Sequence, residues 1–234
     1  MNEAAFLINI KKCKTILNEY NLLKKVNLKN IQLLSYSKYS DIFRKKARQG
    51  DYERIYITGI EMDDYDFLLQ DGSYFQFSYD KNESDFVLRM AFYPTINEIS
   101  YVDFLHEFLE MDIDECGSTF IEDYQQFLTE QEVTRVTPVR YDYNSKIYRP
   151  LVHSSSHIHF GYEENIRIPI DGILLPSAFV KVILQYFYYD SWKEKVLHEE
   201  GQDLYIGNGE KEKINGKFWG ENEKKLPHIH LESF

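Results

Sequence analysis

The spacing of apolar residues predicts several helices along the chain. Between residues 4 and 23, apolar side chains recur every three or four positions, which is the period of one buried helix face. The same period predicts further helices over residues 40–50, 101–111, 118–131 and 177–201. The expected N-caps are Ser40, Ser118 or Thr119, and Ser177, because a side-chain oxygen there can accept a hydrogen bond from the first turn.

Runs of aromatic and β-branched residues predict strands between these helices. The expected strands cover residues 52–62, 64–72, 73–80, 85–94, 133–143, 155–162 and 165–170, with a final short strand within 226–234. Asp71-Gly72 separates two of the runs and is typical of a tight hairpin turn. A second hairpin is expected around Glu163-Glu164, so that the strands form an antiparallel meander.

These elements predict an α+β fold. The expected architecture is an antiparallel sheet, made of a central meander and the hairpin of residues 155–170, packed by N-terminal, middle and C-terminal helices. The chain contains no internal repeat, low-complexity tract or clear linker. We therefore expect residues 1–234 to form a single domain.

Charge and composition narrow the classes of function. The formal net charge of −11 disfavours nucleic-acid or membrane binding by the whole surface, although it leaves room for a local basic groove or a basic partner. Cys13 and Cys116 occur in unrelated contexts, which fits a reducing cytoplasm. No apolar run approaches the length of a transmembrane helix. These features predict a cytoplasmic protein that does not act at a membrane.

One stretch, residues 141–169, concentrates groups that can exchange protons or bind metal. It holds three of the seven histidines. Because residues i and i+2 share a face of a strand, His157 and His159 should project together. His153 could join them through the serine turn. Further candidate residues on or next to this stretch are Arg140, Asp142 and Arg167.

This histidine cluster has three functional interpretations and one structural alternative. His157 and His159 could bind a divalent metal ion, with an oxygen ligand from Asp142, Glu163 or Glu232. Alternatively, two histidines could act as base and acid in metal-free phosphoester cleavage, with Arg167 or Arg140 stabilising the developing charge. The cluster could also bind an anion without chemistry. Histidine alternating with isoleucine also occurs on strands for structural reasons alone.

The C-terminus repeats the H-x-H pattern at His228 and His230. If the two H-x-H strands lay side by side, four imidazoles would share one surface. Their spacing is similar to that of the two-histidine phosphoesterases, but both motifs lack the Ser or Thr that follows in that family's H-x-[ST] pattern. The chain also contains no P-loop, G-x-G-x-x-G, H-E-x-x-H or G-x-S-x-G motif.

Several segments, in order, resemble one bacterial family. They are DYDFLLQDGSYFQFSYD, LRMAFYP, RYDY, HSSSHIHFGYEENIRIP and LLPSAFVKVILQYFY. Over roughly residues 60–190 the chain resembles the family catalogued as domain of unknown function twenty-two ninety. The family implies no established activity, and its genes are associated with mobile or host-defence settings. RYDY followed by the histidines is also similar to the R-x-D…H-x-H pattern of small toxin ribonucleases, which would make Arg140, Asp142, His153, His157, His159 and Arg167 the site.

Two functions from different classes follow as predictions. The first is a nucleic-acid-acting, ribonuclease-like effector of a bacterial toxin or phage-defence system, with RNA or DNA as substrate and a divalent metal as a candidate cofactor. The alternative is a non-enzymatic protein-interaction subunit of a defence or toxin–antitoxin complex. Both predict a protein partner encoded nearby.

Overall fold

The computed structural model describes residues 1–81, 85–96, 101–131, 137–161, 166–198, 206 and 209–231. Contacts divide the chain into two compact units. The larger unit comprises residues 1–94 and 137–234, and the smaller unit comprises residues 95–136. A single domain over residues 1–234 stays a prediction. Among the described residues, no helix is long and apolar enough to cross a bilayer.

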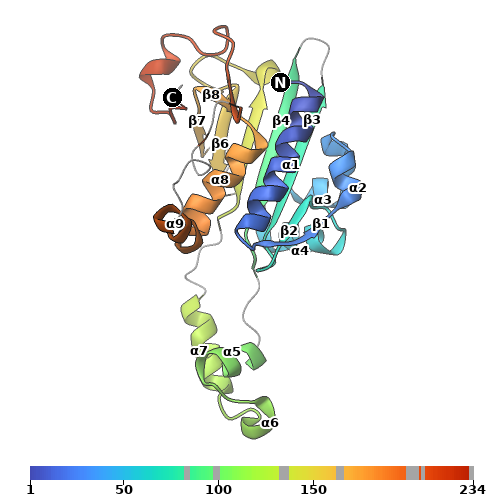
Figure 1. The fold of residues 1–234 in the computed structure, drawn as a ribbon, viewed down its shortest axis with the longest axis vertical. Coiled ribbons are helices and arrows are strands. Elements are labelled where there is room, and N and C mark those ends of the chain that lie inside the picture. The colour runs from blue at the N-terminus through green and yellow to red at the C-terminus, as the bar shows by residue number, and fades with distance from the viewer. Residues whose placement is uncertain are drawn as a thin grey trace. The chain divides into compact units, whose positions relative to one another are not determined.

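The larger unit is built on a seven-stranded antiparallel sheet in which each strand pairs with its neighbour in sequence (Figure 1). The strands are β1 (Leu23–Val26), β2 (Phe67–Leu69), β3 (Tyr74–Lys81), β4 (Phe86–Tyr93), β5 (Val139–Asn144), β6 (Ser156–Phe160) and β7 (Arg167–Pro169). The α+β class and the antiparallel meander are confirmed. β6 and β7 pair as the expected H-x-H hairpin, whose turn at Glu163-Glu164 lies outside the described residues.

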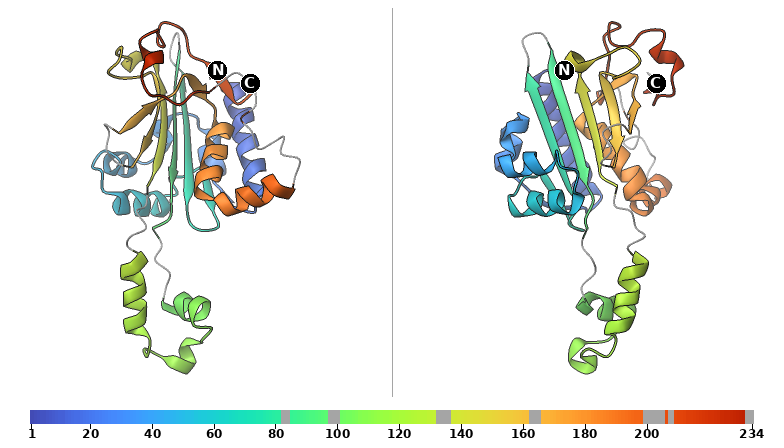
Figure 2. Two further views of the ribbon diagram at one scale, coloured as in Figure 1. Left: turned by 90° about the vertical axis from the view of Figure 1, so that its left-hand side faces the viewer. Right: turned by 180° about the vertical axis from the view of Figure 1, so that it is seen from behind.

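One face of this sheet is apolar and is covered by α1 (Glu3–Glu19) and α8 (Pro176–Phe187), as Figures 1 and 2 show. Successive side chains of a strand point to opposite faces. Phe75, Tyr141 and Ile158 therefore reach the same side from three strands, and each is at most 2% exposed. The edge of the Phe179 ring on α8 meets Phe75 at a centroid distance of 6.2 Å. These side chains form the core. The residues that alternate with them along each strand therefore point to the opposite face of the sheet.

The opposite face is polar and is only partly covered by helices. α2 (Leu28–Gln32), the 3-10 turn η1 (Tyr36–Lys38), α3 (Asp41–Lys46) and α4 (Tyr52–Glu61) lie on this side of the sheet (Figure 2, left). Buried aromatic rings anchor them, because Tyr74 and Tyr93 stack at 4.7 Å beneath Phe43 of α3. Viewed from behind in Figure 2 (right), these helices lie beside β1 to β3, and no helix of the described residues lies in front of β5 and β6. The predicted site residues lie on this second part of the polar face.

The segment of residues 52–62 is a helix, α4, and the prediction of a strand there was wrong. The segment is rich in residues that favour strands, which led to the wrong prediction. Tyr52, Ile55, Tyr56 and Gly59 also follow a helical period, and all four are buried. Asp51 accepts a hydrogen bond from Arg54 N and so caps the first turn. Burial of one helical face outweighed the strand preference of the individual residues.

The C-terminal part of the larger unit also departs from the expected pattern. The single helix expected over residues 177–201 is two helices, α8 and α9 (Tyr189–His198), and Gly201 lies outside the described residues. Ser177 is not the N-cap, because its hydroxyl donates to Asn9 Oδ1 at 2.7 Å and Pro176 occupies the first turn. β8 (Gly172–Leu174) and β9 (Lys211–Lys213), which the sequence did not predict, form a small second sheet. Within residues 226–231, only Ile229 forms a bridge, so no strand is present there.

The smaller unit contains α5 (Tyr101–Phe108), α6 (Ile113–Cys116) and α7 (Ile121–Gln131). Phe108 and Phe127 join two of these helices, with ring centroids 4.7 Å apart. α7 starts later than expected, because the Thr119 hydroxyl donates to Cys116 O at 2.6 Å instead of capping a helix. Thr119 is therefore not the N-cap of α7.

Candidate metal and phosphate site

Two rows of polar side chains cross the polar face of the sheet, mostly on the strands β5 to β7. In the first row, the register places Arg89 of β4 opposite Asp142 of β5, and Asp142 opposite His157 of β6. In the second row, Arg140 lies opposite His159, and His159 lies opposite Arg167 of β7. The core residues Tyr141 and Ile158 alternate with these positions and so hold the two rows on the polar face.

Asp142 lies at the centre of the first row and interacts with both rows. Its Oδ2 accepts a hydrogen bond from Arg140 Nε at 2.7 Å and lies 3.5 Å from His159 Nε2. Its Oδ1 lies 3.9 Å from Arg89 Nε. Burial alone would raise the pKa of Asp142, but the Arg89 and Arg140 guanidinium groups outweigh it and hold this pKa below its usual value. Asp142 is therefore an anion at neutral pH.

His157 and His159 are neutral, because folding lowers their pKa values. Their exposed fractions are 2% and 4%. Burial lowers the pKa of His157 to about 4, although Asp142 acts in the opposite direction. Burial and then the Arg140 charge lower the pKa of His159 to about 3. A neutral imidazole can bind a metal ion or accept a proton, but cannot act as a general acid at neutral pH.

A backbone carbonyl selects the tautomer of two of the histidines. Ser154 O lies 2.9 Å from His157 Nδ1 and 3.1 Å from His153 Nδ1, so both rings donate to it. Donation from Nδ1 leaves Nε2 as the lone-pair atom of each ring. The two rings are perpendicular, with centroids 5.0 Å apart. His153 thus joins the cluster through the serine turn.

Three of the predicted residues have the geometry of a metal site. Asp142, His157 and His159 each offer one ligand atom, and these atoms all lie within 4.8 Å of one another. The imidazole rings of the two histidines are 4.8 Å apart. Two histidines and one carboxylate are a ligand set that binds zinc or iron and leaves positions for water or substrate. The hydrogen bond from His157 to Ser154 O supplies the outer support that ligating histidines usually have.

Arg89, which was not among the residues predicted from the sequence, belongs to the same site. Its guanidinium stacks on the Tyr36 ring at 4.5 Å and faces Asp142. A sequence signal was available, because Arg89 is the one charged residue within the otherwise apolar run FVLRMAFYP. A charge inside a buried strand requires a partner. The site therefore contains three arginines around one carboxylate and three neutral histidines.

The C-terminal H-x-H segment is not next to β6. Ile170 N donates to Ser156 O from one edge of its strand, whereas Ile229 N donates to Pro169 O on the other edge. The end of β7 therefore separates His228 and His230 from His157 and His159. The condition for four imidazoles on one surface, two H-x-H strands side by side, is therefore not met.

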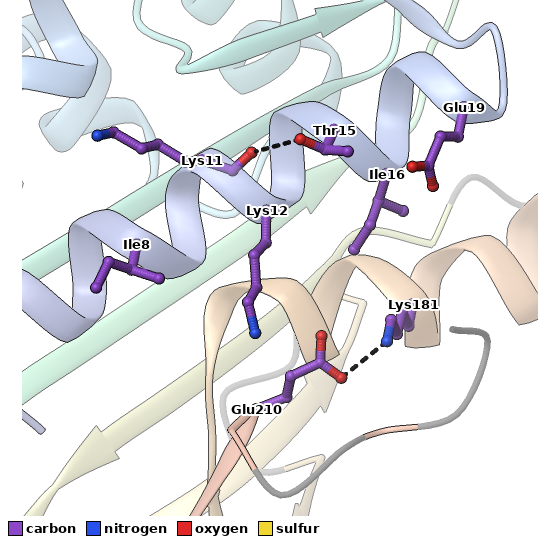
Figure 3. Close-up of a pocket in the computed structure, with 8 residues that line it drawn as sticks. All are labelled: Ile8, Lys11, Lys12, Thr15, Ile16, Glu19, Lys181 and Glu210. Carbon is purple, nitrogen blue, oxygen red and sulfur yellow. Dashed lines mark hydrogen bonds and ion pairs between the residues drawn. The ribbon is translucent and has the colours of Figure 1, made fainter. Parts of the chain in front are cut away.

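A separate pocket, drawn in Figure 3, has none of the site histidines in its lining. It has a volume of about 400 Å³ and is lined mainly by α1, with Lys181 of α8 and Glu210. Lys181 and Glu210 form an ion pair at 2.8 Å. Because α1 and α8 cover the apolar face of the sheet, this pocket is on the opposite side from the polar rows.

The fold and the site together define a meander-sheet protein with a histidine-rich polar face. The chain belongs to the family described as an uncharacterized conserved protein, DUF2290, and matches it over residues 16–231. The expected family resemblance is thereby confirmed and extended beyond residues 60–190. Searches of curated proteins and of solved structures gave no match.

Proposed function

We propose that the protein is a metal-dependent phosphodiesterase that acts on nucleic acid. The observation that carries this proposal is the convergence of Asp142, His157 and His159, whose ligand atoms lie within 4.8 Å of one another beside three arginines. A divalent metal ion there would act as a Lewis acid and would lower the pKa of bound water. The low pKa values of His157 and His159 disfavour a metal-free acid–base pair at neutral pH.

The arginines give this site its preference for a phosphate substrate. Asp142 engages Arg140 directly and Arg89 at longer range, which leaves more positive than negative charge on the face. Guanidinium groups bind phosphate oxygens through two parallel hydrogen bonds and stabilise charge that develops in the transition state. His153 would accept the proton of the attacking water, because it is neutral, partly exposed and adjacent to His157. The arginines make this one face locally positive, although the whole chain carries a net charge of −11.

The direct test combines metal binding with cleavage. The purified chain is stripped with chelator, titrated with Zn²⁺ or Mn²⁺, and incubated with single- and double-stranded RNA and DNA. We expect metal-dependent cleavage, and a loss of at least 100-fold in rate for the His157→Ala/His159→Ala variant, because it removes two of the three protein ligands that would hold the metal ion. The matched control is His106→Ala, an exposed histidine of the smaller unit.

The outcomes separate the interpretations. Equal cleavage by the wild type and the double variant would refute the site. Metal binding at these residues without cleavage of any nucleic acid would refute the enzymatic proposal and retain the metal site. Cleavage that persists in chelator would favour acid–base chemistry instead.

A second candidate function, a non-enzymatic interaction subunit, is favoured by a different observation. The smaller unit exposes large apolar side chains, with Phe108 at 52%, Ile121 at 44% and Met111 at 38% exposure. Clusters of exposed apolar side chains are typical of protein-interaction surfaces. In this interpretation, His157→Ala/His159→Ala would leave partner binding unchanged.

A further inference from the structure

A second group of ligand atoms lies at the C-terminal H-x-H segment. Asp171, His228 and His230 each offer one ligand atom, and these atoms lie within 4.8 Å of one another. Asp171 follows β7, and the two histidines lie near the end of the described chain. At least 57 positions of sequence therefore separate Asp171 from either histidine. The fold therefore brings this second Asp-His-His set together just as it does the first.

The backbone explains why the side chains converge. Ile170 and Ile229 form a parallel bridge, in which Ile229 N donates to Pro169 O and Asp171 N donates to Ile229 O. Ile170 is buried in the core and Ile229 packs against it. The residues on either side, Asp171, His228 and His230, therefore face away from the core, toward the polar face.

Hydrogen bonds prepare these residues as ligands. His228 Nδ1 donates to Leu226 O at 2.7 Å, which leaves Nε2 as its lone-pair atom. Asp171 Oδ1 accepts from Leu231 N at 2.6 Å, and Asp171 Oδ2 contacts His230 Nδ1. The Asp171 side chain is 11% exposed, so it is held in place, whereas His230 is 57% exposed and open to an incoming ion.

We propose that Asp171, His228 and His230 bind a second divalent metal ion that fastens the C-terminal segment to the sheet. The chemistry suits Zn²⁺, which binds two imidazoles and a carboxylate and completes its coordination with water. The bridge at Ile229 is the one strand-like pairing of residues 226–231 in the described chain. A metal ion that joins Asp171 to both histidines would add to this weak attachment.

The two metal sites are separate and do not form a dinuclear centre. His157 lies opposite Pro169, and Pro169 in turn pairs with the segment of His228 and His230. Two strand spacings separate the clusters, which is about 10 Å. The metal ions of dinuclear hydrolases lie about 4 Å apart. Each ion must therefore bind independently.

The second ion would also shape a pocket at the edge of the first site. This pocket has a volume of about 140 Å³ and is lined by Tyr148, Leu151, Val152, Ser154, Arg167, Pro169, Trp219, Glu223 and Leu226. Leu226 belongs to the segment that the ion would hold, and the Trp219 ring contacts the His228 ring of that segment at a centroid distance of 5.0 Å. Just before the segment, Glu223 accepts a hydrogen bond from the Tyr148 hydroxyl at 2.5 Å. Arg167, which also lines this pocket, belongs to the first site.

The test counts bound ions and measures protection of the segment. Native mass spectrometry of the stripped chain with added Zn²⁺ should show two ions, and His228→Ala/His230→Ala should show one. Zn²⁺ should also slow tryptic cleavage after Lys225 at least threefold in the wild type, because Lys225 immediately precedes the segment. The same protection should be absent from His228→Ala/His230→Ala.

Two further variants keep the outcomes distinct. His157→Ala/His159→Ala should lose one ion and retain Zn²⁺ protection at Lys225, and His106→Ala should retain both ions. An unchanged ion count in His228→Ala/His230→Ala, or equal proteolysis with and without Zn²⁺, would overturn the second site. Neither result bears on cleavage at the first site, so the two proposals fail independently.

Discussion

Asp142 is the residue on which the site depends. It is an anion among Arg89, Arg140 and the buried histidines, and its carboxylate connects both polar rows. Asp142 and the three histidines could be predicted from the sequence, because they lie within one short stretch and strand alternation places His157 and His159 on the same face. The charge of Arg89 within an apolar run indicated only that it needs a partner. Its place beside Asp142 depends on the pairing of β4 with β5, a contact across more than 50 positions of sequence.

The histidines make a prediction about pH at the scale of single residues. The pKa values of His157 and His159, about 4 and about 3, lie below the value of about 6.5 in an unfolded chain. The unfolded state therefore binds more protons between these values, and the free energy of unfolding must fall as the pH drops from about 6.5 to 4. The expected loss is on the order of 2 kcal/mol for each histidine.

Urea unfolding of the metal-free chain at several pH values measures this loss. The His157→Gln/His159→Gln variant should show a shallower decline between pH 6.5 and 4 than the wild type. His106→Gln, which replaces an exposed histidine, should follow the wild type. Parallel curves for all three proteins would contradict the buried, neutral state of the site histidines.

At the scale of elements, a buried hydrogen-bond network positions β5 and β6. The Tyr141 hydroxyl accepts from Leu174 N at 3.0 Å and lies 2.9 Å from Ser156 Oγ. Ser156 Oγ also donates to Gly172 O at 2.6 Å. This network joins the two strands of the site to β8 from the core side.

Replacing Tyr141 with Phe should destabilise the fold by about 1–3 kcal/mol. The change removes one hydroxyl and leaves the buried Leu174 N–H without its partner, and an unpaired buried donor costs free energy of this order. Chemical denaturation measures the change in the free energy of unfolding. Tyr186→Phe is the matched control, because Tyr186 on α8 is 71% exposed, and it should change stability by less than about 0.5 kcal/mol. Equal stability of both variants would contradict the role of the network.

The elements also show where local sequence signals fail. Long runs with one clear period, such as α1 and β3, were predicted close to their observed bounds. α4 was not, because aromatic residues favour strands in isolation while their spacing also suits a helix. The short strands β1, β8 and β9 have three or four residues each, which is too few to show a period.

At the scale of the whole molecule, the seven-stranded sheet has one apolar face and one polar face. Its apolar face holds the core beneath α1 and α8, and its polar face carries the cluster of Asp142, His157 and His159. The second cluster shows why topology is needed. Its residues lie far apart in sequence, and only the bridge between Ile170 and Ile229 brings them together. The family match covers both clusters, since it extends over residues 16–231.

The most direct test of the account is a crystal structure of the zinc-loaded chain, with anomalous diffraction recorded on both sides of the zinc edge. We expect an anomalous peak about 2 Å from Nε2 of His157, from a ring nitrogen of His159 and from an oxygen of Asp142. A zinc-loaded crystal with no peak at these three residues, and with Asp142 bonded only to its arginines, would contradict the central claim.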